Sequence, residues 1–272
     1  MKTRAPLVIA NWKLNGGTDL ICTSVTAFIQ RPFNVEVGIA PPYVYIKDLT
    51  NFLRHSRVMI GSQNVSKFES GAFTGETSAQ MLKEVGCEFC LIGHSERRQV
   101  FLENGASCHT KVQRALKAGL MPVICIGENA QQHALGLTKT ILFRQLNETL
   151  QSIDLKGQPL CIAYEPLWAI GSGKAAKPEA VQEIHQYIYD ELCSIFGEAV
   201  ADEIRILYGG SVNKNNAAEL LAKPNVDGLL VGGASLDAEH FAEICAIAND
   251  VSPEASTKPE SSTKAQKPAK TA

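Results

Sequence analysis

The 272-residue sequence lacks any apolar run long enough to cross a membrane, and it lacks a strong excess of either charge. A membrane-spanning helix needs about 20 consecutive apolar residues, and no stretch of this chain approaches that length. The formal net charge of -2 provides no broad basic field for nucleic acid or for an anionic membrane. The sequence therefore predicts a protein that binds neither nucleic acid nor membranes.

A secretory signal and a disulfide framework are also lacking. The apolar run at 6–10 is too short for a signal peptide, and Asn11 and Lys13 end it. Eight cysteines are scattered, mostly inside apolar runs, which is typical of buried free thiols in a reducing compartment. We therefore expect a cytoplasmic protein.

Metal-ligand spacing is absent as well. The single CxxC, from Cys87 to Cys90, has no second pair and no nearby set of histidine ligands, so we expect structural thiols there rather than a redox or zinc site. No cluster of carboxylates, histidines or cysteines has the spacing of metal ligands. The sequence predicts no bound metal and no cofactor.

Short apolar runs rich in β-forming residues are what the sequence does contain. They show little polar alternation, which is typical of strands buried on both faces of a parallel sheet. Segments with helical periodicity lie between them, most clearly 130–152 and 179–196, with Pro178 suited to a first helical turn. In the second segment Ile184, Ile188, Leu192 and Ile195 share one stripe. The eight strand-like runs are 7–10, 35–40, 58–63, 89–93, 122–126, 160–165, 204–209 and 228–232.

Strands alternating with helices are compatible with a (β/α)₈ barrel or with a doubly wound open sheet. The count of eight favours the barrel, and no GxGxxG follows the first run, as a dinucleotide-binding open sheet would require. We predict an α/β fold with a single (β/α)₈ barrel over 1–250. The remainder, 251–272, is rich in Ser, Thr, Pro, Lys and Ala without an aromatic residue, so we expect a disordered tail.

Polar residues gather at the ends of these runs, where barrel enzymes place their chemistry. Each has a structural interpretation by itself: Lys13 could pair with Trp12, His94 could be a hydrogen-bonded structural residue, and Glu165 could be a loop charge. Their common placement at strand ends favours a site. The groups are Asn11, Trp12 and Lys13 after the first run, His94 to Arg97 after the fourth, Glu165 after the sixth, and glycine-rich turns after the last two.

The two glycine turns predict a phosphate site. Barrels often hold phosphate after strands seven and eight, on backbone N–H groups. Ser211 adds a hydroxyl there, and Gly232 and Gly233 allow the backbone to approach the phosphate oxygens closely. We expect a small phosphorylated substrate.

Seven stretches in this order resemble the triosephosphate isomerase family from about residue 5 to 248. They are NWKLN (11–15), GAFTGETS (71–78), IGHSERR (92–98), CIGE (125–128), AYEPLWAIGSGK (163–174), YGGSV (208–212) and VGGASL (231–236). The resemblance implies an intramolecular oxidoreductase of glycolysis and gluconeogenesis that interconverts dihydroxyacetone phosphate and D-glyceraldehyde 3-phosphate through an enediol(ate).

The resemblance also implies a role for each site residue. Glu165 is the general base and His94 a neutral electrophile, the accepted pairing in this family. A helix starting at Ser95 would disfavour an imidazolium at His94. Lys13 stabilises negative charge, and Asn11 orients the substrate. The segment 166–176 is a lid that excludes water.

Supporting roles follow from the same resemblance. Gly171 of the lid contacts the phosphate, Glu96 holds Lys13 or the local network in place, and Cys125 packs beside the base. The loop 64–78 is long and apolar at several positions, and it would form the contact of a homodimer, with Thr74 near the partner's site.

Two alternatives remain. Another phosphate-binding barrel isomerase would share the two glycine turns but not the set of Asn11, Lys13, His94 and Glu165. A barrel that had become a binding protein would be expected to lack a catalytic group or the lid.

Overall fold

Eight parallel strands close into a barrel in this computed structural model, which describes residues 5–31, 33–170 and 176–251. Each strand pairs with the next along the chain, and the last pairs with the first. The predicted (β/α)₈ barrel is confirmed, and each predicted run matches a strand to within one residue at either end. The strands are β1 (Leu7–Asn11), β2 (Glu36–Ala40), β3 (Val58–Ser62), β4 (Phe89–Ile92), β5 (Met121–Ile126), β6 (Cys161–Tyr164), β7 (Arg205–Tyr208) and β8 (Gly228–Val231).

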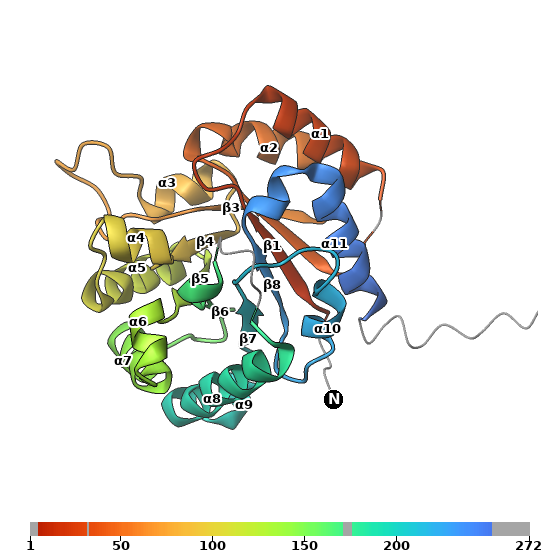
Figure 1. Ribbon diagram of the computed structural model, residues 1–272. Coiled ribbons are helices and arrows are strands. Elements are labelled where there is room, and N and C mark those ends of the chain that lie inside the picture. Colours follow the sequence, from red (N-terminus) through yellow and green to blue (C-terminus); the bar gives the residue numbers. More distant parts are fainter. Residues whose placement is uncertain (1–4, 32, 171–175, 252–272) are drawn as a thin grey trace, which may run out of the picture.

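Helices connect the strands and surround the barrel (Figure 1). The α-helices are α1 (Thr18–Ile29), α2 (Ile46–Leu53), α3 (Ala79–Glu84), α4 (Ser95–Val100), α5 (Gly105–Lys117), α6 (Ala130–Ala134), α7 (Thr138–Leu150), α8 (Pro178–Phe196), α9 (Glu198–Ala201), α10 (Ala217–Leu221) and α11 (Ala238–Asp250). The 3₁₀ turns among the described residues are η1 (Tyr43–Tyr45), η2 (Leu167–Ala169) and η3 (Gly233–Leu236). The predicted tail lies outside the described residues apart from Val251.

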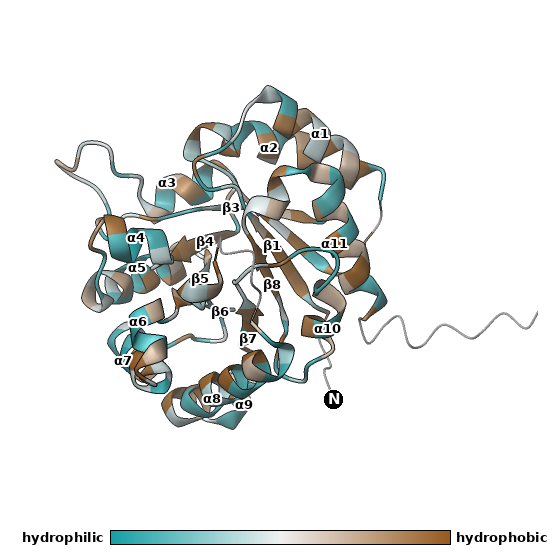
Figure 2. Ribbon diagram, in the orientation of Figure 1, coloured by the Kyte–Doolittle hydropathy of each residue, from teal (hydrophilic) through white to brown (hydrophobic). Residues whose placement is uncertain are grey.

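The strands are buried on both faces, which is why their sequences do not alternate with polar residues. Leu7 and Ile9 of β1 join an apolar cluster inside the barrel, whereas Val8 and Ala10 join the larger cluster between strands and helices. The strands are accordingly hydrophobic along their length in Figure 2. Each fully buried aliphatic side chain of this kind contributes about 1.5–3 kcal/mol of transfer free energy.

Phe89 fills the barrel interior against two glycines. A Cβ atom at Gly61 would lie 2.4 Å from the Phe89 ring, and one at Gly38 would lie 2.9 Å from it. Both distances are shorter than a van der Waals contact, so a side chain at either position would have to displace the ring. These glycines thus make room for one large residue in a closely packed interior.

The helix predictions need two corrections. The segment 130–152 is not one helix, because Gly136 has a left-handed φ of 69° and separates α6 from α7. The second predicted helix is confirmed as α8, but its buried stripe is different from the one expected. His185 is buried beside Ile188, whereas Ile184 and Ile195 are half-buried.

Candidate active site

A cavity of about 400 Å³ opens at the carboxyl ends of the strands. Loops after five strands contribute to it, because the carboxyl ends of parallel strands meet at one rim of a barrel. The structure brings together seven of the eight predicted site residues, and Gly171 lies outside the described residues. The seven are Asn11, Lys13, His94, Glu165, Ser211, Gly232 and Gly233.

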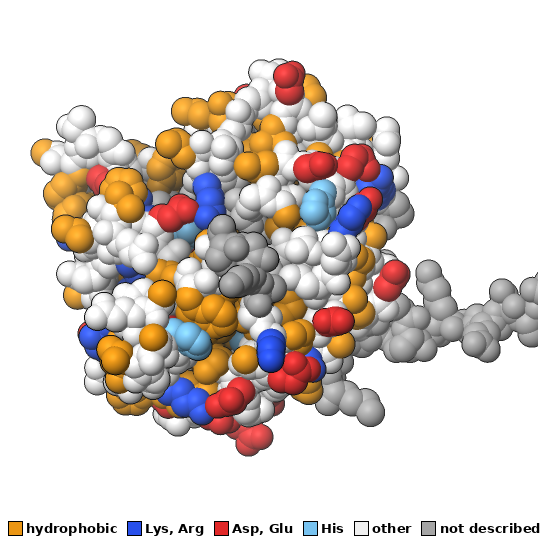
Figure 3. Space-filling model, viewed as in Figure 1, with side chains coloured by type: hydrophobic (Ala, Val, Ile, Leu, Met, Phe, Trp, Pro, Cys, Tyr) orange, Lys and Arg blue, Asp and Glu red, His pale blue; other side chains and the backbone are white. Residues whose placement is uncertain are grey.

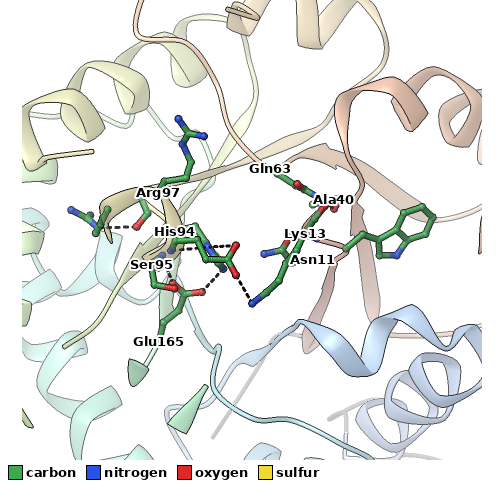
Figure 4. A network of polar contacts seen from close by, with 12 residues as sticks. Asn11, Lys13, Ala40, Gln63, His94, Ser95, Arg97 and Glu165 are labelled. Atoms are coloured by element: carbon green, nitrogen blue, oxygen red, sulfur yellow. Dashed lines mark hydrogen bonds and ion pairs between the residues drawn. The ribbon is translucent and has the colours of Figure 1, made fainter. Parts of the chain in front are cut away.

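Glu165 lies on the floor of this cavity and contacts two neighbours (Figure 4). It follows β6 directly, and only 2% of it is exposed. One carboxylate oxygen, Oε1, is 3.0 Å from Nε2 of His94. The other, Oε2, accepts a hydrogen bond of 2.9 Å from the backbone N–H of Ser95. The carboxylate is therefore held at both oxygens by the loop after β4.

His94 is oriented by the helix that it caps. It is the N-cap residue of α4, and its Nδ1 accepts a hydrogen bond of 3.3 Å from the backbone N–H of Glu96. A ring nitrogen that accepts a hydrogen bond carries no proton, so the neutral tautomer has its proton on Nε2. Nε2 is the nitrogen that faces Glu165 and the cavity.

The pKa values of this pair move in opposite directions. Burial raises the pKa of Glu165, but His94, the Ser95 N–H and Lys13 together outweigh burial, so the pKa lies below its usual value. Burial lowers the pKa of His94, but the Glu165 and Glu96 carboxylates outweigh burial and raise it. The net direction for His94 is therefore set by the two carboxylates, with Glu165 at 3.0 Å, and not by burial.

Lys13 reaches the same site from β1. Its Nζ is 2.8 Å from Oε1 of Glu96, which confirms the prediction that Glu96 holds this lysine. Lys13 has a left-handed φ of 52°, a strained conformation for a residue with a Cβ atom. The Gln63 side chain stabilises this turn, because its amide group donates to the carbonyl oxygens of Lys13 (2.8 Å) and Ala40 (2.9 Å).

Asn11 is the last residue of β1 and is buried. Its Oδ1 accepts a hydrogen bond of 3.1 Å from the backbone N–H of Lys13. Asn11 therefore lies against the turn that carries the lysine, and it also lines the cavity.

Glycine-rich turns after β7 and β8 form the opposite side of the cavity. A Cβ atom at Gly209 would lie 3.0 Å from Cγ of Glu165, and one at Gly232 would lie 3.3 Å from Cε of Lys13. Glycine at these two positions leaves room for the charged side chains. Ser211 and Gly233 line the cavity beside them.

One supporting network could not be found from the sequence. The buried Glu103 accepts a hydrogen bond of 3.0 Å from the N–H of Gly93, the residue before His94. Its other oxygen accepts from Arg97 at 2.8 Å and from the buried Lys111 at 2.5 Å. Sequence reasoning missed this network because Glu103 lies in a loop with no motif of its own.

The cysteines of the described residues do not form part of a metal-binding cluster. None of the eight forms a disulfide, and Cys125 is fully buried beside the base, as predicted. Burial raises the pKa of Cys87 to about 12, which suits a structural thiol rather than a reactive one. In the described part of the chain, no group of three or more His, Cys, Asp or Glu residues could hold a metal ion.

The family model for triosephosphate isomerase matches residues 6–248. The chain belongs to the triosephosphate isomerase family. The triosephosphate isomerase of Nitrosococcus oceani is 43% identical over 249 residues, which cover 90% of this chain and 99% of that protein. That of Photorhabdus laumondii is 45% identical over 245 residues, covering 89% and 96% of the two chains.

A solved structure agrees with this assignment. The crystal structure of triosephosphate isomerase from Bartonella henselae has a TM-score of 0.81 at 36% identity, with 90% of this chain and 99% of that chain covered. The motifs that suggested triosephosphate isomerase therefore lie in a chain that matches the family in sequence and in fold. Among the helices described, none is long and apolar enough to cross a membrane.

Proposed function

We propose that this chain interconverts dihydroxyacetone phosphate and D-glyceraldehyde 3-phosphate, with Glu165 as the general base and His94 as the electrophile. The assignment of this reaction rests on membership in the triosephosphate isomerase family. The observation that supports the two roles is the buried contact of 3.0 Å between Glu165 and His94 at the floor of the cavity. Both groups are thus within reach of one small substrate.

The reaction needs only proton transfers. The Glu165 carboxylate takes a proton from the carbon next to the carbonyl group, and the C–H electron pair forms the double bond of an enediolate. Glu165 then returns the proton to the neighbouring carbon. The hydroxyl proton on the first carbon is transferred to the oxygen on that neighbour, so the first oxygen becomes the new carbonyl, the second becomes the new hydroxyl, and the base is regenerated. No oxidant, reductant or cofactor is consumed, because one carbon of the substrate is oxidised and its neighbour is reduced.

His94 and Lys13 would stabilise the negative charge of the enediolate. The Nε2–H of His94 donates to the substrate oxygen, and the Lys13 ammonium lies on the same cavity. Without substrate, His94 and Glu165 bond each other. A bound substrate would take over both groups and separate the pair.

The phosphate of the substrate would lie against Ser211, Gly232 and Gly233, with Gly171 as a further ligand predicted from the sequence. The cavity wall there is rich in glycine and includes Ser211, which suits an anion held without metal. We expect 2-phosphoglycolate to compete with substrate and EDTA to leave the activity unchanged. Loss of activity on chelation would contradict this assignment.

A coupled assay with glyceraldehyde 3-phosphate tests the function. We expect rapid conversion by the purified chain and strong loss of turnover in His94→Gln, with the same circular dichroism spectrum. A folded wild-type protein without turnover would contradict the proposal.

We also propose that the active form is a homodimer. The loop 64–78 projects away from the barrel between β3 and α3 (Figure 1). Phe68 and Phe73 stack on each other in this loop with ring centroids 3.5 Å apart, and 40% of Phe73 is exposed. A stacked pair of aromatic rings, one exposed and one half-buried, on a projecting loop suits a contact with a second chain.

The surface around this loop supports a dimer. Figure 3 shows hydrophobic side chains gathered over the flank where α3 and α4 lie. The exposed large apolar residues of these elements and the turn after α4 are Met81, Val100, Phe101 and Leu102. In the dimer the loop of one chain would place Thr74 near Asn11 and Lys13 of its partner.

Sedimentation decides between dimer and monomer. We expect a dimer for the intact chain and a monomer with reduced activity when 68–74 are replaced by a short Gly-Ser linker. A monomeric wild type, or a monomeric loop variant with full activity, would contradict the proposal. Six of the eight cysteines are buried, as structural thiols are, which supports a reducing, cytoplasmic location that cell fractionation tests.

A further inference from the structure

Two turns on the glycine-rich side of the catalytic cavity are each held by one polar side chain. The turn after β8 contains Gly232 and Gly233, and the turn after β7 contains Ser211. In each turn a residue a few positions further along the chain donates from its side chain to a backbone carbonyl oxygen. These two residues are Ser235 and Asn216.

Ser235 bonds the carbonyl oxygen of Gly232 with two donors. Its hydroxyl donates to this oxygen at 2.7 Å, and its backbone N–H donates to the same oxygen at 2.8 Å. Only 1% of Ser235 is exposed, so bulk water does not compete for these bonds. The Gly232 carbonyl group is therefore fixed in its direction from inside the protein.

The direction of this carbonyl group decides where the next N–H points. A peptide group is planar and trans, so its N–H points opposite to its carbonyl oxygen. The N–H of Gly233 consequently points away from Ser235. In the described part of the chain it donates to no other group, and Gly233 lines the cavity. An N–H held in this way is available to an anion in the cavity.

Asn216 ties the turn after β7 at two points. Its side-chain amide donates to the carbonyl oxygen of Ser211 at 3.0 Å. Its Oδ1 accepts from the backbone N–H of Asn213 at 2.9 Å. Ser211 and Asn213 both line the cavity. One half-buried side chain thus closes the turn 211–216 and fixes the backbone that carries the Ser211 hydroxyl.

We propose that Ser235 and Asn216 are positioning residues for the phosphate of the substrate. Ser235 directs the Gly233 N–H toward the phosphate, and Asn216 keeps the Ser211 hydroxyl at the cavity wall. Neither is among the described residues that line the cavity, so each acts through the backbone that it bonds. Donors that are already oriented bind an anion more tightly than donors that must first be turned toward it. This inference rests on the proposed phosphate site of the isomerase.

Kinetics with two substrates test this role. Ser235→Ala and Asn216→Ala each remove the side-chain donor and leave the residues that line the cavity unchanged. We expect KM for glyceraldehyde 3-phosphate to rise about 3- to 10-fold, the effect of one hydrogen bond, with kcat within about 2-fold of wild type. D-Glyceraldehyde has no phosphate, so kcat/KM for its isomerisation, followed by NMR, should stay within about 2-fold of wild type.

Ser56→Ala is the matched control. Ser56 bonds the carbonyl oxygen of Leu53 in the same way, with its hydroxyl at 2.8 Å and its backbone N–H at 2.8 Å. It precedes β3 and so lies at the amino ends of the strands, whereas the cavity opens at their carboxyl ends. We expect Ser56→Ala to lose thermal stability to a similar extent as Ser235→Ala and to keep the KM of wild type.

Calorimetric titration with 2-phosphoglycolate provides a readout that does not depend on turnover. We expect its Kd to rise in Ser235→Ala and in Asn216→Ala by the same factor as KM. The Kd of Ser56→Ala should equal that of wild type.

The outcomes separate the two proposals. A wild-type chain that binds 2-phosphoglycolate without converting glyceraldehyde 3-phosphate would overturn the proposed function, whereas weaker binding by the two variants would still support the positioning role. Unchanged KM and Kd in both variants would overturn the positioning role. Losses of the same size with D-glyceraldehyde and with glyceraldehyde 3-phosphate would overturn it as well, because they would not depend on the phosphate.

Discussion

The two sides of the catalytic cavity are built in different ways. After β1, β4 and β6, charged side chains hold one another: Lys13 pairs with Glu96, and Glu165 contacts His94. After β7 and β8, the wall is formed by glycine-rich turns, with Gly209 and Gly232 leaving room for those side chains. The first side places charged side chains at defined distances from one another, and the second side gives the cavity its space through glycine residues.

Because the two sides differ in this way, we expect substitutions on one side to change mainly kcat and substitutions on the other to change mainly KM. A group that acts on the reacting carbon is needed most in the transition state, so its loss lowers kcat. A group that binds the phosphate acts equally in the ground state and in the transition state, so its loss raises KM. Variants on the two sides of the cavity should therefore be distinguishable by kcat and KM alone.

Glu165→Asp should give the largest effect. Shortening the side chain by one methylene group withdraws the carboxylate by about 1 Å, and a displacement of that size lowers turnover by about 10²- to 10³-fold. Steady-state kinetics measures kcat, and circular dichroism checks that the fold is intact. A variant with near-native turnover would remove Glu165 from the role of base.

Gly209→Ala tests whether the backbone side also positions the base. The added Cβ atom would lie 3.0 Å from Cγ of Glu165 and 3.3 Å from the carbonyl oxygen of Tyr164, so the carboxylate must move. We expect kcat to fall about 10-fold, with a smaller change in KM, because a small displacement of the base acts mainly on the transition state. An effect on KM alone would show that Gly209 belongs only to the binding side.

Ser211→Ala should affect binding but not turnover. Loss of one hydrogen bond to a charged phosphate costs about 1.5 kcal/mol, which corresponds to a rise in KM of about 10-fold. We expect kcat to stay within about 2-fold of wild type. A fall in kcat with unchanged KM would contradict the division of the cavity into two sides.

The pairing of Glu165 with His94 should give the smallest effect, a pH dependence of stability. The pKa of Glu165 is lowered, so its contribution is present above about pH 4.3 and is lost as the pH falls through the folded value. The pKa of His94 is raised, so its contribution is present below about pH 6.5 and is lost as the pH rises through the folded value. Both contributions are present between these two values.

Urea unfolding of wild type and His94→Gln measures this dependence. We expect the difference in free energy of unfolding to be larger at pH 5.5 than at pH 8.5, both without substrate. A difference that is equal at the two pH values would mean that the pair does not persist in solution.

Much of the fold could be predicted because short-range patterns specify it. Apolar runs without alternation indicated strands buried on both faces, and β1 and β6 lie where such runs occur. The helix at 130–152 was predicted wrongly because its periodicity continues across Gly136. The left-handed φ of that glycine, which ends α6, is not visible in periodicity.

The sequence by itself determined the order of the strands, the polar residues at their ends, and hence which residue types could meet in one cavity. Each of these follows from local periodicity and from the rule that parallel strands present their carboxyl ends together. Only the tertiary structure decided how the residues meet. Glu165 and His94 are in contact although 71 positions separate them in the sequence (165 − 94). Lys13 and Glu96 are in contact across 83 positions (96 − 13). Interactions over such separations depend on the packing of the whole barrel, and through the Glu165 carboxylate they help to raise the pKa of His94.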